Sequence, residues 1–269
     1  MTRLIWETIK EKKWPIIIYS ASSLLLLLLY VALYPSLQSQ TQQLGEILKA
    51  MPESLLKAFG SASSQLTNFT LESLLATKQF SLVFQSLAAI LAITFAGNDI
   101  SAEIEKGTIE FLLSQPISRL KLYFARFLST AILLTIFAAV STLSVIPMAA
   151  AFHIDYVAAS YYKLFLVAWL YSLAVYAIAF CLSTIFSHKG WVYGISAGII
   201  IVMYVAFLVS ALKDNLDSLK YISFFHYFSA DVLFSGTIDK LGVWIFVLTI
   251  VVGVAIGAVV FNKRDIATS

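Results

Sequence analysis

The most informative polar stretch of this largely apolar chain lies between two long apolar runs. Residues 98–119 read NDISAEIEKGTIEFLLSQPISR, and Glu103, Glu105 and Glu110 give this stretch an acidic side. A short amphipathic helix of this kind can lie on a membrane or dock into a groove of a partner protein. Helices that bind membrane surfaces are usually basic, so the acidic side favours docking on a protein. An ordinary solvated connector remains the alternative.

Helix start and stop signals divide this stretch into two turns. Ser101 can begin a first short helix, and Gly107 can end or bend it. Thr108 can cap a second turn, which Pro116 stops because proline lacks the amide hydrogen that a helix needs. Three apolar residues at i, i+3 and i+4 would form one face of the second turn. These are Ile109, Leu112 and Leu113.

The sequence lacks the residue patterns of catalysis, and we therefore expect no enzyme activity and no cofactor. There is no HExxH pair, nucleophile elbow or carboxylate pair, and no GxxxxGK[ST] loop that would bind ATP. The three histidines lie in expected loops or at span ends, and the single cysteine, Cys181, lies in an apolar run as a packing residue does. No charge stands in the middle of an apolar run, which disfavours an ion-coupled carrier.

Composition places the chain in a membrane. Of its 269 residues, 60% are hydrophobic and only 12% are charged, whereas a soluble domain is about one quarter charged. An apolar excess of this size must face lipid. The net charge of +3 is small and dispersed, which argues against a nucleic-acid partner.

Six apolar runs are long enough to cross about 30 Å of hydrocarbon, which takes roughly 20 helical residues. Helices are expected because lipid cannot satisfy free backbone groups. We predict an all-α protein with one transmembrane domain over residues 1–269. The first run should stay in place as a span, because it exceeds a signal-peptide core and no cleavage site follows it. The expected spans are residues 15–34, 80–97, 122–147, 164–186, 191–212 and 241–261.

The distribution of basic residues predicts the orientation. If the N-terminus is cytoplasmic, most of the 18 Lys and Arg residues, including every arginine, fall in the cytoplasmic segments. The positive-inside rule therefore places both termini in the cytoplasm. Residues 1–14 should form an amphipathic helix at the membrane interface, anchored by Trp6 and Trp14.

The two long loops on the opposite side have distinct characters. Within residues 35–79, the helical spacing of apolar residues such as Leu44, Ile47 and Leu48 predicts amphipathic helices interrupted at Pro52. Residues 213–240 are rich in Tyr and Phe, as is typical of an interfacial or re-entrant segment.

Small and polar residues inside the spans suggest how the helices pack. Glycines recur every four residues in spans 5 and 6, a spacing that lets helices approach closely, within one bundle or at a dimer interface. They are Gly190, Gly194, Gly198, Gly253 and Gly257. Polar side chains within spans could line a pathway, but each is more often a packing hydrogen-bond donor. This set is Gln85, Ser86, Thr94, Thr135, Ser141, Tyr171, Tyr176 and Tyr204.

Residues 105–119, EKGTIEFLLSQPISR, resemble the E-x-G-T-x-E-x-L-L-x-x-P-x-S-R signature of type-2 (ABC-2 type) ABC transporter permeases. The upstream Glu103 fits the acidic run that precedes this signature. Residues 261–266, FNKRDI, are similar to the F-x-x-R-D-I ending of the same family. By pattern, the nearest relatives are bacterial and archaeal permeases grouped with those for copper-enzyme maturation, sodium export and antibiotic export.

The resemblance implies a permease that pairs with a second permease, as a homodimer or heterodimer, above two separate ATPase subunits. Residues 98–119 would form the coupling helix that seats in the ATPase, and the N-terminal helix would make a second contact. The implied coupling residues are Glu103, Glu105, Gly107, Thr108, Ile109, Glu110, Phe111, Leu112, Leu113, Pro116 and Arg119.

We therefore expect an exporter subunit in the plasma membrane that is driven by ATP hydrolysis in its partner. The absence of buried charge favours an amphiphilic or apolar substrate over a bare ion. The alternative is a polytopic protein that regulates or assembles other membrane proteins without transporting a substrate.

Overall fold

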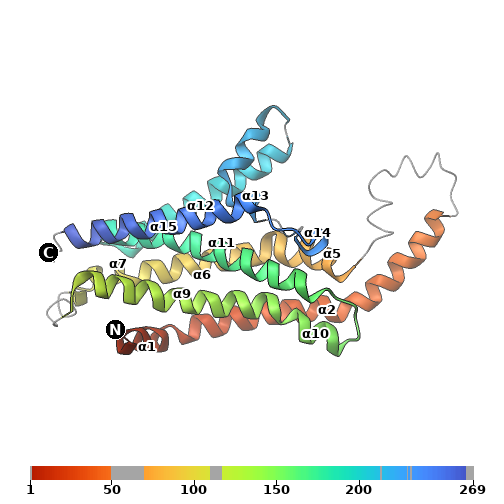
Figure 1. The fold of residues 1–269 in the computed structure, drawn as a ribbon, viewed down its shortest axis with the longest axis horizontal. Coiled ribbons are helices and arrows are strands. Elements are labelled where there is room, and N and C mark those ends of the chain that lie inside the picture. Colours follow the sequence, from red (N-terminus) through yellow and green to blue (C-terminus); the bar gives the residue numbers. More distant parts are fainter. Residues whose placement is uncertain are drawn as a thin grey trace.

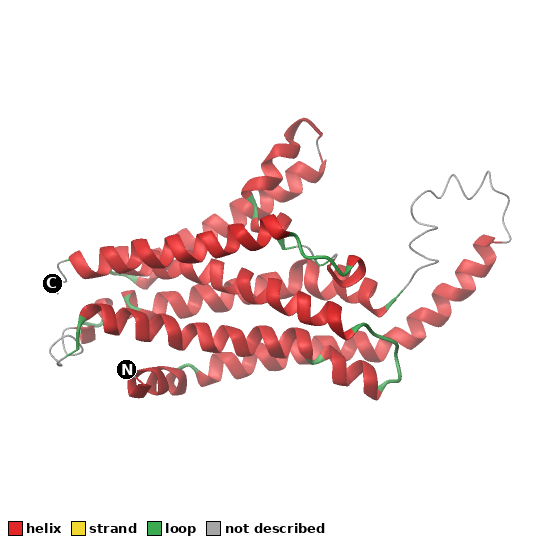
Figure 2. Cartoon of the chain, in the orientation of Figure 1, coloured by secondary structure: helices red, strands yellow, loops and turns green. Residues whose placement is uncertain are grey.

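The computed structural model describes residues 2–49, 70–109, 117–212, 214–228, 230 and 232–264, and these residues form helices and short loops without a strand (Figure 2). Six helical segments are long and apolar enough to cross a membrane, which confirms the predicted all-α, six-span architecture. Their bounds are Lys13–Gln40, Leu71–Asp99, Arg119–Ala151, Ala158–Ile185, Lys189–Leu212 and Lys240–Lys263.

Several spans consist of more than one element. The second span joins two α-helices through a π-helix, η1, and the third consists of two α-helices that meet at Ser144. Element η2, which follows the fifth span, is a 3₁₀-helix. In chain order the elements are α1 (Thr2–Glu11), α2 (Lys13–Lys49), α5 (Leu71–Leu75), η1 (Ala76–Val83), α6 (Phe84–Asp99), α7 (Ser101–Glu105), α9 (Arg119–Leu143), α10 (Val145–Ala151), α11 (Ala158–Ile185), α12 (Lys189–Leu212), η2 (Asp214–Ile222), α13 (Phe224–Tyr227), α14 (Val232–Ser235) and α15 (Lys240–Lys263).

The long helices lie side by side around α11 (Figure 1). Helix α11 packs against α6, α9 and α15, and 72% of its most apolar stretch is buried, compared with 11% for α12 and for α15. A helix that is apolar all round can be enclosed by others, whereas the outer helices turn apolar faces outward as lipid requires. Both ends of the described chain and α7 lie at the same end of the bundle, which we call the terminal end; the opposite end is the distal end.

The first span continues beyond its predicted boundary. The sequence predicts that this span ends at residue 34, but α2 runs through Pro35 to Lys49. A proline removes one backbone hydrogen bond without necessarily ending a long helix. The helix therefore includes the predicted amphipathic positions Leu44, Ile47 and Leu48, while Pro52 lies outside the described residues.

The second span begins earlier than predicted. Thr70 caps α5: its Oγ1 accepts a hydrogen bond from the Ser73 amide at 3.2 Å, and the Ser73 hydroxyl accepts one from the Thr70 amide at 3.1 Å. This reciprocal capping box satisfies two amides that the first helical turn leaves free. Hydropathy failed to indicate the first turns because Glu72 and Lys78 interrupt their apolar pattern.

The aromatic residues of the last loop turn inward at the distal end. Phe225 and Phe228 are buried, and both rings contact Tyr171 of α11. Phe228 also stacks on Phe84 at the start of α6. The sequence correctly indicates an aromatic segment. Its buried rings cover the helical core, whereas Tyr221 of the same segment remains largely exposed.

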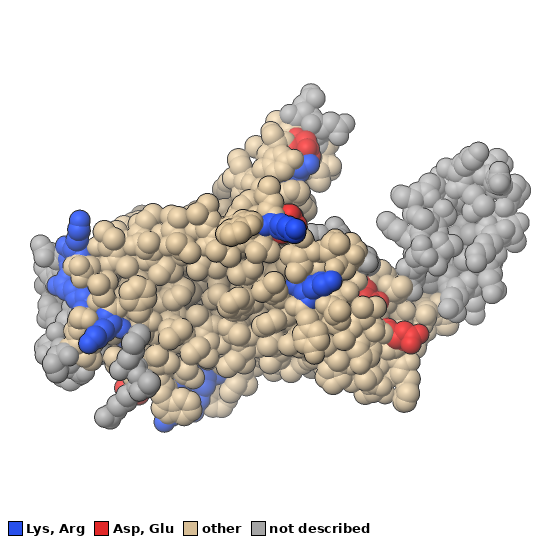
Figure 3. Space-filling model, in the orientation of Figure 1, with Lys and Arg blue, Asp and Glu red and all other residues tan. Residues whose placement is uncertain are grey.

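Charged side chains are absent from most of the middle of the face shown in Figure 3, and a group of Lys and Arg side chains surrounds the terminal end. Exposed apolar side chains cover the outer helices, among them Leu25 of α2, Val202 of α12 and Leu248 of α15. This pattern fits a multi-pass membrane protein, since only lipid can cover so much apolar surface.

Candidate functional site

The acidic stretch identified in the sequence lies at the terminal end. Helix α7 ends at Glu105, and Gly107 follows with a φ of 72° and an amide that donates to the Ile104 carbonyl at 3.0 Å. Because this left-handed conformation favours glycine, Gly107 ends the helix as predicted. Ser101 is not the predicted cap: its hydroxyl donates to the Gly97 carbonyl at 2.7 Å. Glu110, Phe111, Leu112, Leu113 and Pro116 lie outside the described residues.

The described part of this stretch turns its apolar side chains into its own bundle. Ile104 and Ile109 are both buried, so neither is available to a partner protein. The exposed side chains belong to residues 105–108. Among them, Glu105 accepts a hydrogen bond from the Lys189 amide at 3.0 Å, and Thr108 donates one to Glu103. The exposed residues that the structure describes here form a polar ridge; the apolar face predicted from Ile109, Leu112 and Leu113 stays a prediction, because the two leucines lie outside the described residues.

A buried ion pair forms at Asp99, two residues before α7 begins. The Lys12 amine is 2.5 Å from the Asp99 carboxylate, and their side chains are 9% and 0% exposed. Lys12 also donates to the Thr130 hydroxyl at 2.7 Å, and Thr130 donates to the second carboxylate oxygen at 3.1 Å. Tyr176 of α11 donates to the same oxygen at 2.8 Å. Asp99 thus accepts from three donors: Lys12 in the turn between α1 and α2, Thr130 of α9 and Tyr176 of α11.

This arrangement meets the conditions under which a charge can be buried. Removing two ions from water is costly, and only close pairing together with further hydrogen bonds repays the cost. Thr130 and Tyr176 supply those bonds. Burial lowers the pKa of the Lys12 amine, and the Asp99 carboxylate opposes that shift because it favours the charged form.

A second cation joins the N-terminal helix to α7. Arg126 of α9 is 9% exposed, and its guanidinium lies 3.3 Å from the Glu103 carboxylate. The same guanidinium donates to the Thr8 hydroxyl of α1 at 3.2 Å and lies 3.6 Å from Glu11. We call Thr8, Lys12, Asp99, Glu103, Arg126, Thr130 and Tyr176 the terminal-end network.

The two sequence signatures meet in space. Arg119, the last residue of the 105–119 signature, donates to the Arg264 carbonyl at 2.6 Å. Arg264, from the C-terminal signature, donates to the Thr184 carbonyl at 2.7 Å and to the Ser187 hydroxyl at 2.6 Å. These contacts tie the start of α9, the end of α11 and the end of α15 together at the terminal end.

The match to a family model decides the identity of the chain. A model described as an ABC-2 family transporter protein matches residues 8–266, which is nearly the whole chain. The chain belongs to the ABC-2 family of transporter proteins. Permeases of this family are membrane transport components that generally work with an ATPase subunit. A comparison with individually curated proteins gives no match.

Sequence reasoning gave a coupling role to only one of the seven residues in this permease's terminal-end network. It selected Glu103, but it treated Lys12 and Arg126 only as indicators of orientation and gave Asp99 no role. A usable signal did exist: all of these charges lie where an apolar run begins or ends, and charges in such places need partners. What the sequence could not give is the pairing, because Lys12 and Asp99 are 87 positions apart.

The glycines of the ABC-2 permease fall into two groups. A Cβ on Gly257 would lie 2.5 Å from the Tyr123 hydroxyl, and one on Gly253 would lie 3.1 Å from the Ala177 carbonyl. By contrast, a Cβ on Gly190, Gly194 or Gly198 would meet nothing within 4 Å. The proposed packing role of each glycine stays a prediction.

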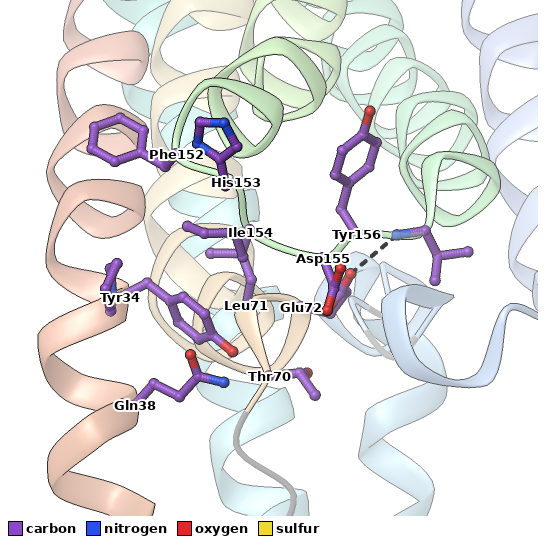
Figure 4. Close-up of a pocket in the computed structure, with 12 residues that line it drawn as sticks. Tyr34, Gln38, Thr70, Leu71, Glu72, Phe152, His153, Ile154, Asp155 and Tyr156 are labelled. Carbon is purple, nitrogen blue, oxygen red and sulfur yellow. Dashed lines mark hydrogen bonds between the residues drawn. The ribbon is translucent and has the colours of Figure 1, made fainter.

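A cavity of about 450 Å³ opens at the distal end, between α2, α5 and the loop before α11. Figure 4 shows Tyr34 and Gln38 on one side of this cavity and Glu72 and Asp155 on another. Glu72 accepts a hydrogen bond from the Val157 amide at 3.3 Å. Its position in the first turn of α5 also suits a carboxylate, because the helix dipole is positive there. Glu72 is thereby explained as a residue that holds this loop.

Proposed function

We propose that this permease is the membrane half of an ATP-driven exporter, with its terminal end in the cytoplasm and a separate ATPase subunit bound beneath α7. ATP would be bound and hydrolysed only by that partner, and the chain would carry no cofactor of its own. A pair of permeases in the plasma membrane would enclose the substrate pathway. The outward direction and the pairing rest on the family resemblance, and the cytoplasmic orientation rests on the positive-inside rule.

The terminal-end network is the observation that carries the coupling role. It connects Glu103 of α7 to Arg126 of α9, and Arg126 to Thr8 of α1. A second group within the same network joins Asp99 of α6 to Lys12, to Thr130 of α9 and to Tyr176 of α11. A force applied to the exposed ridge at residues 105–108 would therefore reach α9 and α1 through Glu103 and Arg126, and α6 and α11 through Thr130, which shares α9 with Arg126.

The proposed mechanism is mechanical. Closure of the ATPase pair on ATP would displace the ridge, and the network would move α1, α6, α9 and α11 with it. Packed interfaces respond to such a displacement by changing between discrete arrangements rather than by bending continuously. The polar residues would transmit the movement, and none of them would take part in a chemical step.

The test replaces the glycine that shapes the ridge. Gly107→Ala adds a Cβ at a φ of 72°, which costs an ordinary residue about 1–2 kcal/mol. We expect this variant to reach the membrane and to bind its ATPase more weakly or to stimulate it less. The measurement is affinity purification of the tagged chain from its native membrane in mild detergent, followed by an ATPase assay of the co-purified complex.

Gly236→Ala is the matched control, because Gly236 also has a left-handed φ, of 61°, but directly follows α14 (Val232–Ser235), which lies at the distal end (Figure 1). Equal backbone strain at the two ends should affect coupling only at the terminal end. If the chain purifies without any nucleotide-binding partner, the coupling proposal fails and a regulatory or assembly role takes its place. Equal ATPase activity in Gly107→Ala and wild type would also count against it.

A further inference from the structure

The N-terminal helix α1 packs against α9 along one side, and its other side is exposed. On the packed side, Thr8 is buried and bonded to Arg126, and Ile9 contacts the apolar core. On the other side, Trp6 and Lys10 are exposed, and the exposed fraction of Trp6 is 58%. Tryptophan is enriched where a membrane protein crosses the boundary between lipid and water, so this side of α1 suits that boundary.

The start of α2 has the same pair of residue types. Lys13 and Trp14 are both exposed, and the exposed fraction of Trp14 is 64%. The exposed apolar residues Ile17 and Ile18 follow about one helical turn later. These isoleucines belong to the apolar surface of the first span, which must face lipid. The two exposed lysines therefore lie next to the point where the lipid-facing surface begins.

Each exposed lysine lies over the ring of a tryptophan. The Lys10 amine is 5.3 Å from the centroid of the Trp6 ring, and the Lys13 amine is 5.7 Å from that of the Trp14 ring. We call these four residues the Lys–Trp surface. A ring attracts the positive charge above its face but supplies no oxygen acceptor for the N–H donors of the amine. Both amines can therefore still bind an anion.

The lysine between these two shows the contrast. Lys12 is buried in its ion pair with Asp99. In the part of the chain that the structure describes, no ion pair joins Lys10 or Lys13 to a carboxylate. Glu11 is next to Lys10 in the sequence, but its carboxylate is directed at the Arg126 guanidinium, 3.6 Å away. The Lys–Trp surface thus carries two positive charges that this part of the chain does not balance.

We propose that the Lys–Trp surface binds anionic phospholipids, whose phosphate groups accept hydrogen bonds from the two amines while the indole rings lie at the level of the headgroups. Lysine is a common ligand of phosphate, and lysines next to a span attract anionic lipids. A lipid fits better than an acidic partner protein, because the surface continues directly into the lipid-facing side of the first span. Placing these lipids in the cytoplasmic leaflet rests on the proposed orientation, whereas the binding itself does not.

The experiment measures lipid binding to the purified full-length chain by native mass spectrometry, without an ATPase. The probes are phosphatidylglycerol and phosphatidylcholine with identical dioleoyl chains, which differ in the net charge of the headgroup. We expect the chain to bind the first phosphatidylglycerol molecule more tightly than the first phosphatidylcholine molecule. Equal affinity of the wild-type chain for the two lipids would overturn the proposal.

A double variant tests the two lysines, and a second double variant is its matched control. Lys10→Gln with Lys13→Gln should weaken binding of phosphatidylglycerol about 25-fold, because each lysine near an anionic surface contributes about fivefold. Lys121→Gln with Lys263→Gln removes the same charge from exposed positions at the terminal end (Figure 1). Among the described residues, neither of these two lysines lies over an aromatic ring, so this control should weaken binding far less.

The proposal fails if the control weakens binding as much as the Lys10 and Lys13 variant, since general attraction to positive charge would then explain the preference. It also fails if the Lys10 and Lys13 variant keeps its affinity for phosphatidylglycerol but co-purifies with less ATPase, because the surface would then contact a protein. Lipid binding is measured without an ATPase, so a failure of the coupling test would leave this result unaffected.

Discussion

Breaking the ion pair between Lys12 and Asp99 should destabilise the protein more than any exposed ion pair could. Lys12→Met would leave the Asp99 carboxylate buried, with only the hydroxyls of Thr130 and Tyr176 as donors. Removing one partner of a buried pair typically costs about 3–5 kcal/mol. Because two hydroxyl donors remain, we expect about 3 kcal/mol for this variant and a similar loss for Asp99→Asn.

The double variant separates the pair from its surroundings. Once one partner is gone, loss of the second removes the uncompensated charge, so Lys12→Met with Asp99→Asn should be little less stable than either single variant. The expected coupling energy is therefore about 2–3 kcal/mol. The assay is a double-mutant cycle of the free energy of unfolding in mixed micelles, followed by tryptophan fluorescence.

An exposed ion pair of nearly the same length provides the comparison. Lys220 lies 2.6 Å from Asp217, but these side chains are 26% and 55% exposed. Water screens such a pair, so replacing both residues should give nearly additive effects. A coupling below about 0.5 kcal/mol for Lys12 and Asp99 would mean that the two sites act independently, and it would refute the reasoning from burial.

Two further predictions concern close helix contacts and the terminal end. Gly257→Ala should lower the thermal stability in detergent, because the new Cβ would displace the Tyr123 hydroxyl from the Val254 carbonyl; Gly194→Ala should not, since open space surrounds it. Equal stability of the two variants would contradict this. Arg264→Ala should speed amide hydrogen exchange in residues 184–189, because the hydrogen bonds of Arg264 to Thr184 and Ser187 are lost. Unchanged exchange there would show that these residues keep their conformation without Arg264.

The sequence alone was sufficient to predict the six spans, because each is a long run of apolar residues that are contiguous in the chain. Runs of apolar residues such as 241–261 show their character without reference to the rest of the chain. The boundary of the second span was not predictable in this way, since capping by Thr70 depends on hydrogen-bond geometry that hydropathy ignores. The continuation of α2 beyond residue 34 was missed for a similar reason, because the residues that follow are mostly polar and hydropathy does not show that a helix continues past its apolar part.

The candidate site was only partly predictable, and the reason is the distance along the chain between its members. Glu103 lies just before a contiguous signature, whereas its partner Arg126 lies on α9 and Thr8 on α1. Gln85 was recognised as a polar residue within a span, but the sequence gave no reason to separate it from Thr135, which accepts a hydrogen bond from Trp169 in ordinary packing. Only the structure shows that the side-chain oxygen of Gln85 is buried without a hydrogen-bond partner among the described residues.

The length of α2 has a consequence for the water-facing side of the membrane. At 1.5 Å per residue its 37 residues extend for about 55 Å, whereas the hydrocarbon core is only about 30 Å thick. Even with a moderate tilt, the last turns must stand well clear of the lipid. The last residues of α2 therefore extend as a helix into the aqueous compartment. If the distal end faces outward, a protease or an antibody added to intact cells could reach this helical extension.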